Sequence, residues 1–329
     1  EGFVFIDADF YVAEMISFAQ VQFFLFGSSA LGETILAGQD PHLRTAAGFL
    51  GISYEEAVTR YKAKDPILKG MRQLAKPFNF GKPGGMGNEK FYTLAQGQLA
   101  DEHCLICHGT GHLRGGVSCS CLPIQDFTKE KCKEFGDLWL ETYPESKQYF
   151  RHISRSLQLW PESGMTINQF VSNRIRGRVG YTDGCNTFFQ GLTADGGNEA
   201  MIRVSRACYT DRSSPLYGCR PWNWVHDQSI TEAREEVAAE AAEELERLMV
   251  EGMRSVLPDM APAVKCDAAL MRRWRKSAEA VRVNGRLIPY EDRPLKEEEI
   301  EMVIKLRETK GLYAAALAFG LELDRVGRL

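Results

Sequence analysis

Two cations and an aromatic ring share one face of a predicted helix, an arrangement that suits a nucleoside triphosphate. Arg72, Lys76 and Phe80 occupy every fourth position, so on a helix their side chains lie on one side. The cations can bind phosphate oxygens while the ring packs against a sugar or a base. A second interpretation stays open, a solvated basic helix that ends in a core phenylalanine.

The end of this predicted helix contains helix-breaking residues. Pro77 lies inside the helical pattern, where it removes a backbone hydrogen bond, so we expect a bend there. Residues 81–87 are rich in glycine and contain Pro83, which predicts a flexible loop.

Acidic residues follow a predicted strand at the start of the chain. The run Phe3–Ile6 is aromatic and β-branched, which is typical of a buried strand, and it brings Asp7 and Asp9 to its end. A carboxylate there can reach a metal ion, although many such acids only cap a helix or face water. Glu14 then opens a predicted helix, Met15–Phe26.

Another acid follows a second predicted strand, late in the chain. Trp222–Val225 is aromatic and β-branched, and His226 and Asp227 come directly after it. A His-Asp pair occurs by chance in many chains, so this stretch indicates no function by itself. Behind it, Ser229–Glu232 has the spacing of a capping box and predicts the start of an acidic helix. The predicted buried stripe of that helix is Val237, Ala241, Leu245, Leu248 and Gly252.

Residues 101–126 predict a structural zinc site. Cys104 and Cys107 form a Cys-x-x-Cys pair, and Cys119 and Cys121 form a second pair beyond a glycine-rich loop. Structural zinc binds four such thiolates in a tetrahedron, which leaves no open position for catalysis. Unligated reduced thiols and a redox pair are the alternatives. Three histidines are reserve ligands: His103, His108 and His112.

Three arginines alternate along another predicted strand. Arg174, Arg176 and Arg178 project from one side of residues 173–181, a spacing that can follow a phosphate backbone. The alternative is an exposed edge strand protected by charge. The Asp-Gly pair at 183–184 predicts a hairpin turn after this strand.

Local signals place further elements. Asn186 and Gln190 lead into a predicted helix that runs to about Tyr209, and their amides can reach base or sugar edges. Asp40 is a predicted N-cap, which puts His42 in a first helical turn, near amides that favour anions. Residues 281–288 predict a hairpin with a type I′ turn. The remaining predicted helices are 127–157, broken at Pro144, and 296–310 and 312–323.

Composition limits the class of protein. The chain has 329 residues, 44% of them hydrophobic, and a net charge of -4, which excludes a wholesale polycation and confines nucleic-acid contacts to local basic patches. No apolar run is long enough to span a bilayer and no secretory signal is visible, so we expect a cytoplasmic protein. Its nine cysteines then indicate reduced thiols or a metal site. The missing initiator Met indicates a fragment or a processed chain.

Four motifs, in their order along the chain, resemble those of the family A DNA polymerases. The resemblance is strongest to the bacteriophage-type members. The four motifs are the strand ending in Asp9 with Glu14 after it, the face of Arg72, Lys76 and Phe80 followed by glycine, the Asn-x-x-x-Gln-Gly-x-x-Ala-Asp segment from Asn186, and the strand ending in His226-Asp227. The likeness runs from about residue 3 to about residue 280.

The resemblance implies an α+β fold with the palm and fingers of a right-hand polymerase. The palm would have an antiparallel sheet with helices and comprise residues 1–30 and 151–281. Helical fingers at 31–150 would carry the zinc-ribbon-like insertion at 101–126, and residues 282–329 would form a C-terminal extension without assigned chemistry. The thumb and any exonuclease domain would precede residue 1, in the same polypeptide or in a separate chain.

The resemblance also implies a reaction: Mg-dependent transfer of a deoxynucleotidyl group from a dNTP to a primer 3′-hydroxyl, with release of pyrophosphate, in DNA replication. Asp9 and Asp227 would hold two Mg²⁺ ions, with the backbone carbonyl of Phe10 as a further ligand. Arg72 and Lys76 would bind the β- and γ-phosphates, and Lys76 would protonate the leaving pyrophosphate.

Other residues would choose and hold the substrates. His42 would add a phosphate contact, and Glu14 stacked on Phe80 would form a steric gate against ribonucleotides. Asn186 and Gln190 would contact the minor groove of the primer-template, where they report fit rather than sequence. His226 would steady the primer terminus.

Three positions depart from the family pattern. Gly84 stands where a tyrosine that stacks on the template base is usual, Gln228 replaces the usual glutamate after His-Asp, and Pro77 lies inside the fingers helix. Two other functions compete with DNA synthesis: a single-subunit RNA polymerase, and a catalytically silent nucleic-acid-binding subunit with a zinc ribbon and a basic hairpin.

Overall fold

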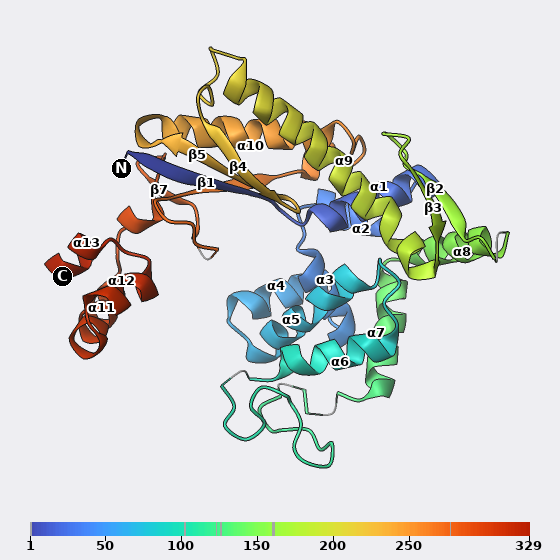
Figure 1. The fold of residues 1–329 in the computed structure, drawn as a ribbon. Coiled ribbons are helices and arrows are strands. Elements are labelled where there is room, and N and C mark those ends of the chain that lie inside the picture. The colour runs from blue at the N-terminus through green and yellow to red at the C-terminus, as the bar shows by residue number, and fades with distance from the viewer. Residues whose placement is uncertain (1, 102, 123, 126, 160–161, 277) are drawn as a thin grey trace. The chain divides into compact units, whose positions relative to one another are not determined.

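The computed structural model shows a mixed α+β protein and describes residues 2–101, 103–122, 124–125, 127–159, 162–276 and 278–329. Positions 102, 123 and 126 of the predicted cysteine-rich insertion lie outside the described residues. The chain divides into two compact units (Figure 1). Unit 1 comprises residues 1–11, 196–255 and 264–329, and unit 2 comprises residues 12–195 and 256–263. The α+β class predicted from the sequence is confirmed.

Unit 1 is built on a four-stranded antiparallel sheet in the order β4-β5-β1-β6. Its strands are β1 (Phe3–Phe10), β4 (Arg220–Val225), β5 (Gln228–Arg234) and β6 (Cys266–Met271). β1 is central, with β5 on one side and β6 on the other. The first strand is therefore longer than predicted, and Asp7 and Asp9 lie within it instead of after it.

Alternation along β1 gives the sheet two different faces. Val4, Ile6, Ala8 and Phe10 are at most 5% exposed, and helix α10 (Ala238–Arg254) packs against β1 and β6. Asp7 and Asp9 must point to the opposite face, because successive side chains of a strand alternate. Asp7 and Asp9 therefore lie on the face of the sheet opposite to the one that α10 covers.

The predicted helix start at Ser229–Glu232 is wrong, since these residues lie in β5. Both edges of β5 pair, one with β1 and the other with β4, so its backbone groups are used in the sheet. The acidic helix follows a short 3-10 turn, η1 (Glu235–Val237), and begins at Ala238. Val237 is 37% exposed and lies outside the buried stripe, whereas the other four predicted positions are buried.

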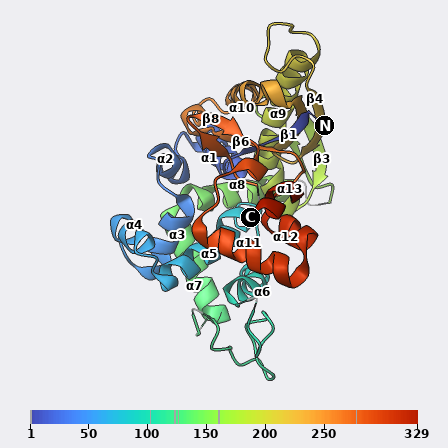
Figure 2. The ribbon, with the colours of Figure 1, turned by 90° about the vertical axis from the view of Figure 1, so that its left-hand side faces the viewer.

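The end of unit 1 contains a hairpin and three helices. β7 (Val281–Val283) pairs with β8 (Arg286–Ile288), and Asn284 and Gly285 both have positive φ, which confirms the type I′ turn. η3 (Tyr290–Asp292) follows, and then come α11 (Glu297–Lys310), α12 (Leu312–Phe319) and α13 (Leu323–Arg328). Figure 2 shows these helices grouped together.

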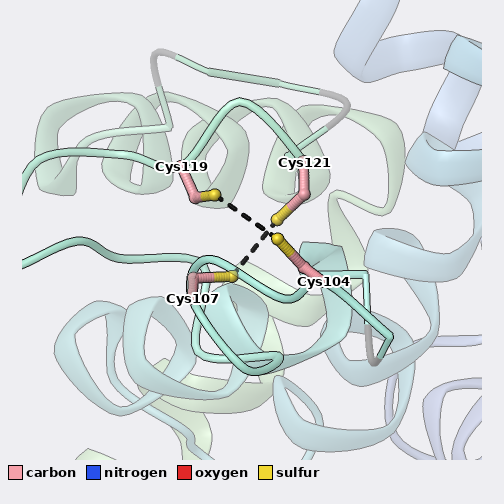
Figure 3. A group of neighbouring side chains, drawn as sticks. All are labelled: Cys104, Cys107, Cys119 and Cys121. Atoms are coloured by element: carbon pink, nitrogen blue, oxygen red, sulfur yellow. Dashed lines mark hydrogen bonds between the residues drawn. The ribbon is translucent and has the colours of Figure 1, made fainter.

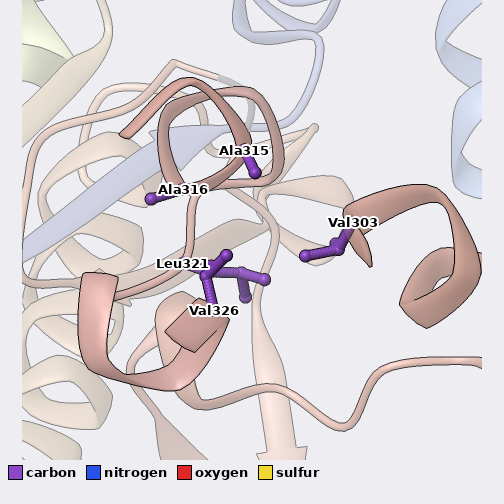
Figure 4. Packing of buried hydrophobic residues seen from close by; sticks show 5 residues of the cluster. All are labelled: Val303, Ala315, Ala316, Leu321 and Val326. Carbon is purple, nitrogen blue, oxygen red and sulfur yellow. The ribbon is translucent and has the colours of Figure 1, made fainter. Parts of the chain in front are cut away.

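The three C-terminal helices have a small core of their own (Figure 4). Its buried members are Val303, Ala315, Ala316, Leu321 and Val326. The predicted helix at 312–323 ends early, at Phe319, because Gly320 takes a left-handed conformation.

Unit 2 is mainly helical. Its elements are α1 (Ala13–Phe26), α2 (Ala30–Leu36), α3 (Pro41–Leu50), α4 (Tyr54–Lys62), α5 (Pro66–Gly81), α6 (Asn88–Leu99), α7 (Lys129–Thr142), α8 (Glu145–Gln158), β2 (Met165–Asn168), β3 (Ile175–Val179) and η2 (Ala261–Ala263). α9 (Tyr181–Tyr209) begins in unit 2 and ends in unit 1. The predicted break at Pro144 between α7 and α8 is confirmed.

Aromatic rings form much of the core of unit 2. Phe18 on α1 packs against Tyr149 and Phe189, and Phe49 on α3 packs against Phe78 and Phe135. Helix α5 is amphipathic, with Leu74 and Phe78 on its buried side, and it continues through Pro77. The burial of this side holds the helix together at the position where proline removes a hydrogen bond.

The predicted hairpin after residue 181 is wrong. β3 pairs with β2, which precedes it, and residues 183–184 lie in the first turn of α9. Asp183 is an acidic residue in the first turn of α9, where a negative charge is favourable, so Asp-Gly here belongs to a helix start instead of a hairpin turn. Within the part of the chain that the structure describes, no helix is long and apolar enough to cross a bilayer.

Candidate functional site

Three neighbouring strands bring acidic and amide side chains together on the open face of the unit 1 sheet. Asp9 on β1 lies directly opposite Gln228 on β5 and opposite Asp267 on β6. Asp227 lies in the two-residue turn between β4 and β5, immediately before Gln228. The register therefore places Asp9 and Asp227 at the same end of the sheet, as the sequence analysis expects of two metal-binding carboxylates.

The pKa of Asp9 reports the closeness of the other acids. Burial, then the charge of Asp227, then that of Asp7 raise it from 3.8 to about 6, while the Phe10 amide and Lys276 lower it less strongly. Burial also raises the pKa of Asp227, and the nearby His226 acts in the opposite direction. Like charges held this close repel each other unless a cation lies between them.

In metal-free protein we expect the free energy of unfolding to fall as the pH rises from 3.8 to about 6. The Asp9→Asn variant should show a smaller fall. Since the pKa of Asp9 is about 6 in the folded chain and 3.8 ordinarily, the folded chain alone keeps this proton between those values. The stabilisation is complete at lower pH and is lost as the pH passes 6. Asp9→Asn should therefore raise the Tm at pH 7.

Thermal unfolding in EDTA at pH 5 and pH 7 measures this difference. Asp211→Asn is the control, because Asp211 lies in an exposed turn of the same unit and its pKa is lowered by hydrogen bonds from Ser213. It should leave the difference in Tm between pH 5 and pH 7 unchanged. Equal differences in the wild type and in Asp9→Asn would contradict the assignment of the raised pKa to Asp9.

A cavity of about 490 Å³ opens at this acidic face. Its lining comes wholly from unit 1 and is Asp7, Asp9, Phe10, Tyr11, Gln228, Asp267, Ala268, Ala269, Lys276, Ala278, Glu279 and Ala280. The sequence analysis missed Asp267, Lys276 and the structural part played by Asp7. Alternation within the strand could have placed Asp7 beside Asp9, whereas nothing local in the sequence pairs Asp267 with Asp9.

The cationic face of α5 in unit 2 exists as predicted, but its two cations differ. Arg72 is held by Asp40, with Nη2 and Nε at 2.6 Å and 2.7 Å from Oδ2, and its guanidinium lies over the ring of Tyr61. Lys76 is half-buried and takes part in none of the ion pairs found among the described residues. Of the two cations, Lys76 is therefore the more available to bind a ligand, because Arg72 is already paired with Asp40.

His42 lies beside these cations and is uncharged. Asp40 caps α3 as predicted, accepting from the amides of His42 and Leu43. Burial, helped by the charges of Arg72 and Lys76 and opposed by that of Asp40, lowers the pKa of His42 to about 4. At neutral pH His42 is thus a hydrogen-bonding imidazole, paired with the Asn79 amide at 3.0 Å.

Phe80 ends the face and is 41% exposed. Its ring centroid lies 5.3 Å from that of His42. The stacking of Glu14 on this ring stays a prediction.

Gly84 lies against the start of α9, which explains the departure there. The Asn186 amide donates to the carbonyls of Gly84 at 3.3 Å and Thr182 at 3.0 Å. A Cβ at position 84 would clash with Asn186 Oδ1, so no side chain fits without displacing Asn186. A tyrosine at position 84 would therefore require the Asn186 side chain to move.

Arg174, Arg176 and Arg178, in and directly before β3, do not form one continuous row. Arg174 pairs with Asp195 at 2.6 Å, and Arg176 donates to Thr187 Oγ1 at 2.7 Å, so both are turned toward α9. They line one cavity with Gln190, while Arg178, which has a positive φ, lines another. The β-bulge between β2 and β3 breaks the simple alternation that the sequence analysis used.

The four cysteines of the insertion meet at one point (Figure 3). Their sulfur atoms all lie within 4.8 Å of one another, with Cys104 and Cys119 at 3.7 Å and Cys107 and Cys121 at 3.3 Å. Zinc with Zn–S bonds of about 2.3 Å places tetrahedral sulfur ligands about 3.8 Å apart. The cluster has the size and donor set of a structural zinc site, and the reserve histidines are not needed to complete it.

Comparison with known proteins gives a consistent likeness. No protein-family model matches the chain. DNA polymerase I of Helicobacter pylori, from two strains, is 21% identical over 253 residues and 22% identical over 252 residues. Each match covers 75% of this chain and 22% of the relative, so the chain spans about a fifth of these proteins.

A solved structure shares the fold. It is the POL domain of Pol1 from M. smegmatis in complex with DNA primer-template and dNTP. The match has a TM-score of 0.57 at 20% identity and covers 83% of this chain and 40% of that one. The chain therefore has the fold of a polymerase domain.

Proposed function

We propose that this chain carries the palm and fingers of a family A DNA polymerase and catalyses template-directed DNA synthesis. The observation that carries the proposal is the meeting of Asp9 and Asp227, which lie far apart in the sequence, at one end of an antiparallel sheet. The shared fold and the DNA polymerase I relatives support the same chemistry. The bacteriophage-type assignment remains a prediction.

The acidic pair fits two Mg²⁺ ions. Asp9 and Asp227 are hard oxygen donors. Burial and the charge of Asp227 raise the pKa of Asp9, and a divalent cation would remove the repulsion between the two acids. When bound, Mg²⁺ would lower the pKa of the primer hydroxyl and neutralise the triphosphate. Asp9 would have to be ionised to bind it, and the carbonyl of Phe10 would be a further ligand. We therefore expect Mg²⁺ binding to weaken below about pH 6.

The cationic face of α5 would bind the triphosphate. Lys76 would hold a phosphate oxygen and give a proton to the leaving pyrophosphate, while Arg72, kept in place by Asp40, would orient the β- and γ-phosphates. His42, being neutral, would contribute a hydrogen bond rather than a charge. Phe80 and Glu14 would exclude the 2′-hydroxyl of a ribonucleotide.

The remaining candidates would hold the primer-template. Asn186 and Gln190 lie one turn apart on α9 and would read the minor groove. His226 would contact the primer terminus from the turn before Asp227. The exposed guanidinium groups of Arg174, Arg176 and Arg178 would bind the phosphate backbone. Contacts with α9 hold the first two in place.

A structural zinc ion would tie the insertion together. We expect Cys107→Ser to lose the bound zinc and to lower the Tm by roughly 5 °C or more, because the metal replaces a hydrophobic core in so small a loop. Burial opposes ionisation of Cys107, but hydrogen bonds from the Cys121 thiol and the Gly111 amide outweigh it and lower its pKa to about 6. Cys107 is thus prepared to bind as a thiolate.

Metal analysis of protein purified under reducing conditions measures the zinc content. Cys132→Ser is the matched control, because this cysteine is buried in the same unit but lies outside the cluster. It should retain one zinc per chain. Equal metal content in Cys107→Ser and Cys132→Ser would rule out the Cys₄ site.

Primer extension with Mg²⁺ tests the function directly. The protein should extend a DNA primer on a DNA template with dNTPs and should incorporate rNTPs at least about 100-fold more slowly. Equal use of rNTPs would favour the RNA polymerase alternative. Binding of primer-template without any extension would favour the silent nucleic-acid-binding subunit.

A further inference from the structure

Asp7 is a buried acid that binds neutral partners. It is 9% exposed, its Oδ1 accepts from Gln228 Nε2 at 2.5 Å, and its Oδ2 accepts from Trp274 Nε1 at 3.1 Å. Asp7 takes part in none of the ion pairs formed among the described residues. Burying a carboxylate without a paired cation costs free energy, so stabilisation of the fold does not explain this residue.

The two donors connect Asp7 to the acidic pair from both sides. Gln228 follows Asp227 directly in the chain and is paired with Asp9 in the sheet, so its contact with Asp7 holds a residue that is adjacent to both candidate metal ligands. Trp274 lies in the segment after β6 that also brings Lys276 to the cavity, near Asp9. A single carboxylate thus links β1, the start of β5 and the segment after β6, all within unit 1.

We propose that Asp7 and Gln228 form a positioning pair, which orients the Gln228 amide and the Trp274 segment so that Asp9 and Asp227 keep the spacing needed to bind metal. The inference rests on the proposed function of Asp9 and Asp227 and adds to it the pairing of Asp7 with Gln228. Residues that orient metal ligands from behind commonly change metal affinity or activity by about 10- to 100-fold when they are replaced.

The chemistry of the pair predicts a rescue. Gln228→Glu sets two carboxyl groups face to face at a contact that is now 2.5 Å long, and while both are ionised neither can donate and they repel each other. Adding Asp7→Asn restores a donor: the amide introduced at position 7 can donate to the new carboxylate while its oxygen accepts from Trp274. In Asp7→Asn alone, the Gln228 amide can turn so that its oxygen accepts from the new donor, which keeps the contact but removes the charge of Asp7.

The test compares Gln228→Glu, Asp7→Asn and the double variant by single-turnover primer extension and by Mn²⁺ titration followed by electron paramagnetic resonance. We expect Gln228→Glu to lower the rate and the Mn²⁺ affinity about tenfold. Asp7→Asn alone should lower both quantities less than Gln228→Glu does, and the double variant should return to within about threefold of the wild type. A Tm within a few degrees of the wild type shows that each variant is folded.

Asp267→Asn in the Gln228→Glu background is the matched control. It removes a carboxylate from the same sheet face, opposite Asp9, but from another strand than Asp7. Recovery by Asp267→Asn equal to that by Asp7→Asn would overturn the pairing and leave only a general effect of charge. A Gln228→Glu variant as active and as tight for Mn²⁺ as the wild type would overturn it as well.

Failure of the inference can be told from failure of the proposed function. Mn²⁺ affinity is measured without primer or dNTP, so it reports the pair even in an inactive chain. A wild type that binds Mn²⁺ but extends no primer would contradict the proposed polymerase function. An active wild type without the rescue would contradict only the positioning pair.

Discussion

Asp227→Asn should reduce primer extension by at least about 10³-fold while the protein stays folded. The replacement keeps the size of the side chain but removes half of the charge that the acidic pair offers to Mg²⁺. Metal stabilisation of the reacting oxygens is worth several kcal/mol, and each 1.4 kcal/mol is about tenfold in rate. Single-turnover incorporation of one dNTP at saturating Mg²⁺ measures the loss.

The control for this variant is Asp211→Asn, which also removes one carboxylate from unit 1 but at an exposed turn. Its rate should stay within about twofold of the wild type, as for other surface substitutions. Burial raises the pKa of Asp227, so the Asn variant should be at least as stable as the wild type in EDTA. Residual extension by Asp227→Asn close to that of Asp211→Asn would refute the two-metal assignment.

Lys76→Met should lower the rate of dNTP incorporation by about 100-fold or more. A charge-assisted contact to a group that gains negative charge in the transition state typically contributes 10²- to 10³-fold. Lys76 is the more available cation on α5, since Arg72 is already bound by Asp40. Methionine keeps the apolar length of the side chain, so helix packing should be preserved.

Lys62→Met provides the matched comparison. Lys62 lies in the last turn of α4, in the same unit, and is exposed. Its variant should extend primers at nearly the wild-type rate. Measuring kcat and KM for dNTP separates the two contributions of Lys76: proton donation to pyrophosphate would appear in kcat, and phosphate binding alone in KM. Equal rates for the two variants would remove Lys76 from the site.

Neutral His42 changes how this face should respond to pH. Its pKa of about 4 means that it does not gain charge between pH 5 and pH 8. His42 should therefore contribute no step to the pH–rate profile between pH 5 and pH 8. The sequence alone placed His42 correctly in a first helical turn but could not show that Asn79 and burial would keep it uncharged.

Several features of the candidate site depend only on neighbours in the chain, and these could be predicted. The spacing of Arg72, Lys76 and Phe80 sets one helix face, and the two cysteine pairs set a metal-sized cluster. The Asn284-Gly285 turn and the Asp40 cap also follow from local backbone chemistry. Each of these patterns acts within a few residues, where the covalent chain itself holds the groups together.

Other features depend on which strand pairs with which, and local patterns misled there. Ser229–Glu232 reads as a helix cap by spacing, yet it pairs on both edges within the sheet. Residues 183–184 read as a hairpin turn, yet β3 pairs with the strand before it. Tertiary pairing overrides weak local preference because it satisfies every backbone group of the segment at once.

Residue type and short-range spacing are covalent properties, so the chemical groups of this protein and their order can be read from its sequence. The folded chain adds relations that no local pattern contains: Asp7 faces Gln228 and Trp274, Asp267 lies opposite Asp9, and two arginines turn toward α9. These relations come from strand register and helix packing between segments far apart in the chain. A shift of one residue in that register would send Asp9 to the buried face of the sheet and remove the site.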